Sequence, residues 1–483
     1  MYAKRGSFIQ KSCADMPSIK RNFLYSSILS VSGYLFPLMT FPYISRVLGV
    51  DNVGLCNFVD SVINYFVLFS MLGIGVVGIR EVAKNKADKE ALSFCFRDII
   101  VFNLILTFIV EVILVASVFL VPRLYAHKEL YFIGALKLLA NVFLIEWFYK
   151  GMEEFRYITL RSIVVKALYV AAVFLFVRDR KDYGVYYFLM ASMYVINAVF
   201  NWSYLRRFIS FRVESARPWR YGKTIAIMGC HLILTSMYTT FNIIYLGFAA
   251  NETEVGYYTT ATKLYSIIMA LFTTFTGVML PRMSSLVAEE KMEEFEKLVN
   301  LSYSLLFKFS FPLVVLTVVY APEIIHFISG SGYEGAIVPM RIVMPLMVVI
   351  GYEQIIIVQT LMPLKKDKAV FVNSMIGAVV GLILNLLLVP CLKSVGSAMV
   401  WVCSEVAVMF SAQCWLRKYW DRRFPYLMFL KELANLSPVL LGMLLVACLF
   451  ELYSLPMFYA LLVSCVMVIA YYLFCYKLQK ARA

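Results

Sequence analysis

The sequence predicts an all-α integral membrane protein of about 14 transmembrane helices, with two six-helix lobes in a parallel pseudo-two-fold repeat and two extra C-terminal helices. Hydrophobic residues make up 61% of the 483 residues, and the mean hydropathy is +0.78. They fall in successive runs of about 20 residues, the length that a helix needs to cross a bilayer. A lipid-facing strand would alternate in polarity, and these runs do not.

The spans follow one another with short polar connections, none of them long enough for a soluble domain. They are expected near residues 25–48, 54–79, 94–121, 129–149, 157–178, 184–205, 225–249, 257–280, 300–320, 338–361, 369–389, 396–416, 433–453 and 456–476.

Basic residues predict the orientation. Most of the 45 Lys and Arg fall in segments that share one face if the N-terminus is cytoplasmic, among them residues 80–97 and 206–223. The positive-inside rule therefore places both termini in the cytoplasm. We interpret the net charge of +15 as this topology signal plus attraction to anionic membrane lipid, which excludes nucleic acid as the favoured partner.

A short internal repeat predicts the lobes. Leu48-Gly49 followed by Val53-Gly54 recurs as Leu246-Gly247 followed by Val255-Gly256, six spans later and at the same helix boundary. The expected organisation is a cytoplasmic segment at 1–24, an N-lobe at 25–205, a basic linker at 206–224, a C-lobe at 225–416, and the last two helices with a cytoplasmic tail at 417–483.

The sequence lacks the residues that several kinds of enzyme and metal site require. The ten cysteines are scattered and no His cluster accompanies them, so neither a metal site nor disulfides are expected. No phosphate-binding loop, zinc-protease helix or nucleophile elbow occurs, and the predicted outer loops are too short for an enzyme site. The first apolar run is too long for a signal-peptide core and is expected to be retained.

Five segments resemble one transporter family. They are "FPLMTFPYISRVLGVDNVG" (36–54), "GIGVVGIREVAK" (73–84), "EWFYKGMEEFRYI" (146–158), "VGYYTTATKL" (255–264) and "MLPRMSSL" (279–286). Together they resemble the bacterial polysaccharide-repeat-unit (O-antigen type) flippases of the multidrug/oligosaccharidyl-lipid/polysaccharide exporter superfamily.

This resemblance implies that the chain flips undecaprenyl-pyrophosphate-linked oligosaccharide from the inner to the outer leaflet of the bacterial cytoplasmic membrane by alternating access, for surface polysaccharide synthesis. It is not expected to be an enzyme or to hold a cofactor. Coupling to protons or sodium ions is left unassigned. The lipid-linked glycan and membrane lipid are the expected partners, and polysaccharide polymerase or assembly proteins are further ones.

Asp60 and Lys263 are the first candidates for the transport pathway. They lie six and seven residues after Gly54 and Gly256, on equivalent helices of the two lobes. If these helices face each other, an acid and a base meet at one depth; the alternative is separate snorkelling to the interface.

Four further positions are candidates on weaker grounds. Arg46 and Arg341 lie near outer helix ends, where a guanidinium either attracts pyrophosphate or snorkels. Pro37 and Pro42 are expected to kink the first helix, either as a gate or as a common structural feature.

Matched depths within the lobes predict two structural ion pairs, Glu111 with Lys137 and Lys308 with Glu353. Lys166 and Glu405 receive no assignment. The aromatic run at 147–149 has two interpretations, an interfacial belt and sugar stacking.

Two other functions compete with the flippase. A cation-coupled exporter of small molecules or drugs on the same fold would need an apolar, acidic pocket, which the basic intramembrane excess disfavours. An envelope-assembly enzyme embedded in the membrane is the less favoured alternative, because no extramembrane site is expected.

Overall fold

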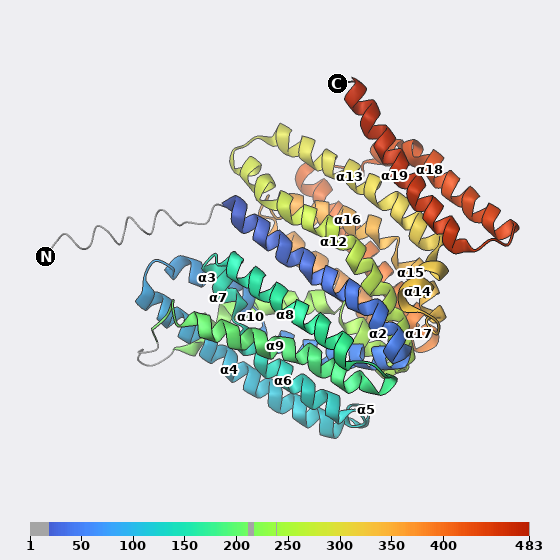
Figure 1. Cartoon of the computed structure of the whole chain (residues 1–483). Coiled ribbons are helices and arrows are strands. Elements are labelled where there is room, and N and C mark those ends of the chain that lie inside the picture. Colours follow the sequence, from blue (N-terminus) through green and yellow to red (C-terminus); the bar gives the residue numbers. More distant parts are fainter. Residues whose placement is uncertain (1–18, 211–216, 238, 483) are drawn as a thin grey trace. The chain divides into compact units, whose positions relative to one another are not determined.

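A computed structural model describes residues 19–210, 217–237 and 239–482 (Figure 1). Every regular element in these ranges is a helix, which confirms the predicted fold class. The α-helices are α2 (Ile19–Met71), α3 (Ile74–Asn85), α4 (Lys89–Leu120), α5 (Pro122–Tyr125), α6 (Lys128–Leu144), α7 (Glu146–Gly151), α8 (Phe155–Phe176), α9 (Tyr183–Leu205), α10 (Gly222–Ser236), α11 (Phe241–Ala249), α12 (Glu252–Ala288), α13 (Met292–Val319), α14 (Ala321–Ser329), α15 (Ile337–Val343), α16 (Leu346–Ile356), α17 (Asp367–Trp420), α18 (Tyr426–Leu452) and α19 (Met457–Arg482). The short elements are η1 (Arg180–Asp182), η2 (Pro218–Tyr221), η3 (Glu334–Ala336) and the π-helix η4 (Ile357–Leu361).

Eleven helices in the described ranges are long and apolar enough to span a membrane, or up to twelve if a bent pair at 218–249 counts as one span. The two longest of the eleven, 48 residues within α2 and the 54 residues of α17, are long enough for two crossings each. Each contains a residue with non-helical dihedral angles, Gly49 (φ 77°) in α2 and Lys393 (φ 50°) in α17. Since each break allows two crossings, the predicted count of about 14 is compatible with the structure.

The chain divides into two compact units. Unit 1 comprises Met1–Pro37, Phe66–Leu175 and Tyr186–Cys230, and unit 2 comprises Leu38–Tyr65, Phe176–Val185 and His231–Ala483. The predicted lobe boundaries at 25–205, 225–416 and 417–483 stay predictions. Most of the predicted segment 1–24, and residues 211–216 of the predicted linker, lie outside the described residues.

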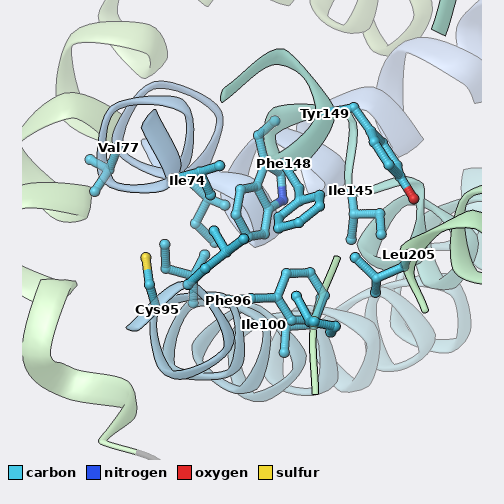
Figure 2. Packing of buried hydrophobic residues seen from close by; sticks show 14 of the residues in the cluster. Ile74, Val77, Cys95, Phe96, Ile100, Ile145, Phe148, Tyr149 and Leu205 are labelled. Atoms are coloured by element: carbon cyan, nitrogen blue, oxygen red, sulfur yellow. The ribbon is translucent and has the colours of Figure 1, made fainter. Parts of the chain in front are cut away.

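An aromatic core holds unit 1 together. Phe96 of α4 stacks on Trp147 of α7 at 5.7 Å between ring centroids and meets Phe148 edge-on at 5.3 Å. Figure 2 shows Phe96 and Phe148 enclosed by aliphatic side chains from the neighbouring helices. Trp147, Phe148 and Tyr149 are at most 3% exposed. They are therefore core residues, and the interpretation of this run as an interfacial belt is wrong.

Unit 2 is built around α17, which packs against α11, α12, α15 and α16. The last two helices, α18 and α19, lie side by side (Figure 1), and α18 also packs along α13. A buried hydrogen bond joins α19 to the rest of unit 2, between the Tyr320 and Ser464 hydroxyls at 2.8 Å. The C-terminal helices are thus packed parts of unit 2.

Candidate functional site

Two glycines let α2 and α12 touch through their backbones within unit 2. A Cβ atom on Gly54 would lie 1.8 Å from the carbonyl oxygen of Glu252, and one on Gly256 would lie 2.5 Å from that of Val50. No side chain fits at either position without moving the other helix. The repeated glycines found in the sequence are therefore the point where the two equivalent helices meet.

Polar side chains join the same helices on both sides of this contact. The Thr253 hydroxyl donates to Asp51 Oδ1 at 2.5 Å, and the Asn57 amide donates to Thr259 Oγ1 at 3.0 Å. Each bond joins residues 202 positions apart, which is also the separation of Gly54 and Gly256. Equivalent positions of the repeat thus face one another along this interface.

One turn further along, Asp60 and Lys263 come together as the sequence predicts. Both are half-buried, and Lys263 interacts electrostatically with Asp60 and with Cys56. The Lys263 ammonium lies 4.6 Å from the ring centroid of the buried Phe41, and the Asn64 amide donates to Asp60 Oδ2 at 3.0 Å. Acid and base therefore occupy one level of unit 2, while their role in a pathway stays a prediction.

Arg46 and Arg341 bind helix ends in the structure. Arg46 donates to the carbonyl oxygen of Pro42 at 3.1 Å and to that of Phe327, near the end of α14. Arg341 donates through Nε to the carbonyl of Val318 at 3.1 Å, near the end of α13. The bonds to Phe327 and Val318 satisfy carbonyls that a helix end leaves open. Pyrophosphate attraction by either residue stays a prediction.

Pro37 and Pro42 lie inside α2, whose dihedral angles are non-helical only at Gly49. The Pro42 carbonyl, at the second proline, accepts the bond from Arg46 and another from the Ser45 hydroxyl at 3.2 Å. The chain passes from unit 1 to unit 2 at Pro37. Gating by the two prolines stays a prediction.

The predicted pair of Lys308 with Glu353 is wrong. Lys308 of α13 forms its ion pair with Glu432 of α18, at 3.4 Å, and Ser304 also donates to this carboxylate, at 2.6 Å. The prediction rested only on the matched depth of the two residues in the membrane. Glu432 was not considered, because it lies on a helix that supplied no motif. The packing of α18 on α13 decides the partner instead.

Glu353 has an acidic neighbour. Its carboxyl group lies in side-chain hydrogen-bond contact with that of Glu405, to which Trp401 Nε1 donates at 2.9 Å. Glu405 is only 5% exposed. The previously unassigned Glu405 therefore belongs to a buried carboxyl pair between α16 and α17.

The second predicted pair, Glu111 with Lys137, stays a prediction. Glu111 Oε2 is buried without a hydrogen-bond partner, and the Lys137 ammonium lies 4.8 Å from the ring centroid of Tyr194.

Sequence reasoning missed Phe41, Cys56, Asn57 and Thr259 around the Asp60–Lys263 pair. Applying the separation of the repeated glycines to every polar residue nearby would have found Asn57 with Thr259. Nothing in the sequence points to Phe41, because its contact depends on how the first part of α2 packs.

The arrangement can bind an anion or exchange charge partners, since a half-buried ammonium is held by one carboxylate beside an aromatic ring. Among the described residues no group of three or more His, Cys, Asp or Glu side chains could hold a metal ion.

Known structures share the fold of this protein. The lipid II flippase MurJ, in an inward closed conformation, matches with a TM-score of 0.75 over 93% of this chain and 97% of that chain, at 15% identity. An inward-facing multidrug resistance MATE family transporter of the MOP superfamily matches with a TM-score of 0.59 over 84% of this chain and 94% of its own, also at 15% identity. The fold is therefore that of the MOP superfamily of membrane transporters.

The model of the family described as polysaccharide biosynthesis protein matches residues 19–287, so the chain belongs to that family. A putative O-antigen transporter of Escherichia coli (strain K12) is 24% identical over 406 residues, which cover 81% of this chain and 95% of the relative. One from Shigella dysenteriae is 21% identical over 282 residues, 56% of this chain and 69% of the relative. The family match agrees with the resemblance that the five motifs predict, and the shared fold is that expected for the superfamily.

Proposed function

We propose that this protein is a flippase that carries undecaprenyl-pyrophosphate-linked oligosaccharide repeat units from the inner to the outer leaflet of the bacterial cytoplasmic membrane. The single observation that carries the proposal is the Asp60–Lys263 pair at the meeting point of the two repeat helices. Family membership and the names of the relatives, O-antigen transporter and lipid II flippase, support the class of cargo.

Lys263 takes part in transport by exchanging partners. An ammonium away from water is costly unless an anion neutralises it. Asp60 supplies this anion when the transporter is empty, and the cargo's phosphates compete for Lys263 when cargo is present. Asn64, which donates to Asp60, holds the carboxylate in place during the exchange. Alternating access then moves the headgroup while the isoprenoid tail stays in lipid.

The test is a Lys263→Ala variant in a deletion strain complemented at equal transporter abundance. Surface polysaccharide per transporter molecule should fall roughly tenfold or more, since hydrogen bonds to charged groups contribute about 1.5–3 kcal/mol. Lipid-linked repeat units should accumulate on the cytoplasmic side. Lys263→Arg should retain part of the output because it keeps the charge.

Lys291→Ala is the matched control, because Lys291 is exposed and its ion pair with Glu289 at 2.8 Å lies outside the helix crossing. It should leave the output unchanged. Wild-type output from Lys263→Ala at equal abundance would remove Lys263 from the mechanism.

A drug or small-molecule exporter is the second candidate, because the MATE family transporter has the same fold. Resistance to cationic drugs in the deletion strain separates the two. A loss of resistance with normal surface polysaccharide would favour the exporter.

A further inference from the structure

A cavity of about 380 Å³ opens in unit 1 beside the first turns of α4, whereas the Asp60–Lys263 pair belongs to unit 2. Its lining includes three arginines, Arg97 of α4 with Arg217 and Arg220 near η2. Among the described residues that line it, Asp98 is the only one with an acidic side chain. The cavity therefore carries an excess of positive charge.

Hydrogen bonds hold residues that line this cavity against the aromatic core of unit 1. Asp98, 3% exposed, accepts a bond at 2.8 Å from the backbone N–H of Arg217, which anchors the chain entering η2. The Tyr221 hydroxyl is hydrogen-bonded to the thiol of Cys95. Figure 2 shows Cys95 beside Phe96 in the aromatic core. The backbone that carries these arginines is thus anchored to α4.

The neighbouring carboxylate of Glu81 already forms ion pairs with other cations. Glu81 lies close to this region and binds Arg80 at 3.1 Å and Lys84 at 2.9 Å. Burial acts to raise the pKa of Glu81, but the hydrogen bonds from Lys84 and Arg80 outweigh it and lower the pKa overall. Glu81 is therefore held as a carboxylate by cations outside the cavity lining.

Two of the lining guanidinium groups stay available for a ligand. Within the described residues, neither the Arg217 nor the Arg220 side chain forms an ion pair or a hydrogen bond, and both residues are exposed. The Arg220 guanidinium lies 5.5 Å from the ring centroid of Tyr221. Arginines that merely snorkel would not need a shared cavity.

We propose that this cavity binds the phosphate group of an anionic membrane lipid. Guanidinium groups bind phosphate through two parallel hydrogen bonds, and basic pockets at the cytoplasmic ends of membrane helices suit lipid headgroups. The basic segment 80–97 places this end of α4 on the predicted cytoplasmic face. The phosphate belongs either to bulk phospholipid or to an isoprenoid pyrophosphate, and both present the same chemistry.

The test measures lipid retained by the purified full-length protein in native mass spectrometry. The probes are dihexanoylphosphatidylglycerol, farnesyl pyrophosphate, inorganic pyrophosphate and dihexanoylglycerol, which has no phosphate. At least one of the two phosphate-bearing lipids should be retained, and the Arg217→Gln/Arg220→Gln double variant should retain it roughly tenfold less, given the strength of charged hydrogen bonds. Retention of only one of them identifies the source of the phosphate.

Arg207→Gln is the matched control, since Arg207 is an exposed arginine of the same unit that lies over Tyr204 and outside the cavity. Arg220→Lys, which keeps the charge but loses the planar fork, should give intermediate retention and covers the case of a poorly folded double variant. Equal retention by the folded double variant, equal retention of dihexanoylglycerol, or retention of inorganic pyrophosphate alone would overturn the proposal. Because the assay does not involve transport, its result is independent of the Lys263 experiment.

Discussion

Glu432 shows how a single buried carboxylate organises its surroundings. Its side chain is 7% exposed, and it accepts from Ser304 at 2.6 Å and pairs with Lys308 at 3.4 Å. Its other oxygen, Oε2, is buried without a hydrogen-bond partner. Lys308 is therefore the cation that compensates this charge, and it joins α13 to α18.

Lys308→Met should lower the free energy of unfolding by about 1–2 kcal/mol, because it leaves the Glu432 charge buried and uncompensated. The value is set below that of a fully buried pair, since the Lys308 side chain is 40% exposed and solvent screens it. Thermal unfolding of the purified protein in detergent measures the change.

A double-mutant cycle identifies the partner. Lys308 and Glu432 should show coupling, with the Lys308→Met/Glu432→Gln variant recovering part of the loss. Lys308 and Glu353 should show none. Coupling to Glu353 of equal size would contradict the ion pair in the structure.

At the level of elements, the contact of α2 with α12 depends on two missing side chains. Small residues let membrane helices approach closely, and here backbone atoms of one helix occupy the place of a Cβ on the other. The bonds of Asp51 with Thr253 and of Asn57 with Thr259 fix the register of the same contact. This element pair positions Asp60 against Lys263.

Gly54→Ala and Gly256→Ala should each force the helices apart, at a cost of about 1–3 kcal/mol for overpacking. Folded yield and thermal stability should both fall. Gly277→Ala is the control on the same helix α12, where a Cβ meets nothing within 4 Å. It should be neutral or slightly stabilising, because alanine favours a helix more than glycine does. Normal stability of Gly54→Ala would argue against the backbone contact.

For the whole molecule, the distribution of basic residues predicts the orientation in the membrane. Arg206, Arg207, Arg217, Arg220 and Lys223 lie in one connection, which the positive-inside rule assigns to the cytoplasm together with both termini. The proposed lipid-phosphate cavity includes Arg217 and Arg220, so its leaflet depends on the same assignment.

Reporter fusions that are active only in the periplasm, placed after Gln479 and within the 206–223 connection, should be inactive. A fusion in the 330–334 turn before α15, which is predicted to lie outside, should be active. Periplasmic activity at either of the first two sites would reverse the assignment.

The sequence by itself determined the all-helical membrane class and the family, and it singled out Asp60 and Lys263 as residues that meet if their helices face each other. Hydrophobic runs of membrane-spanning length admit only helices, and the repeated Gly54 and Gly256 mark equivalent positions that a two-fold repeat brings together. Tertiary structure alone decided the partners of Lys308 and Glu353. Residues at equal depth can lie on any side of a helix. The packing of α13 on α18 places Lys308 beside Glu432, and the packing of α16 on α17 places Glu353 beside Glu405.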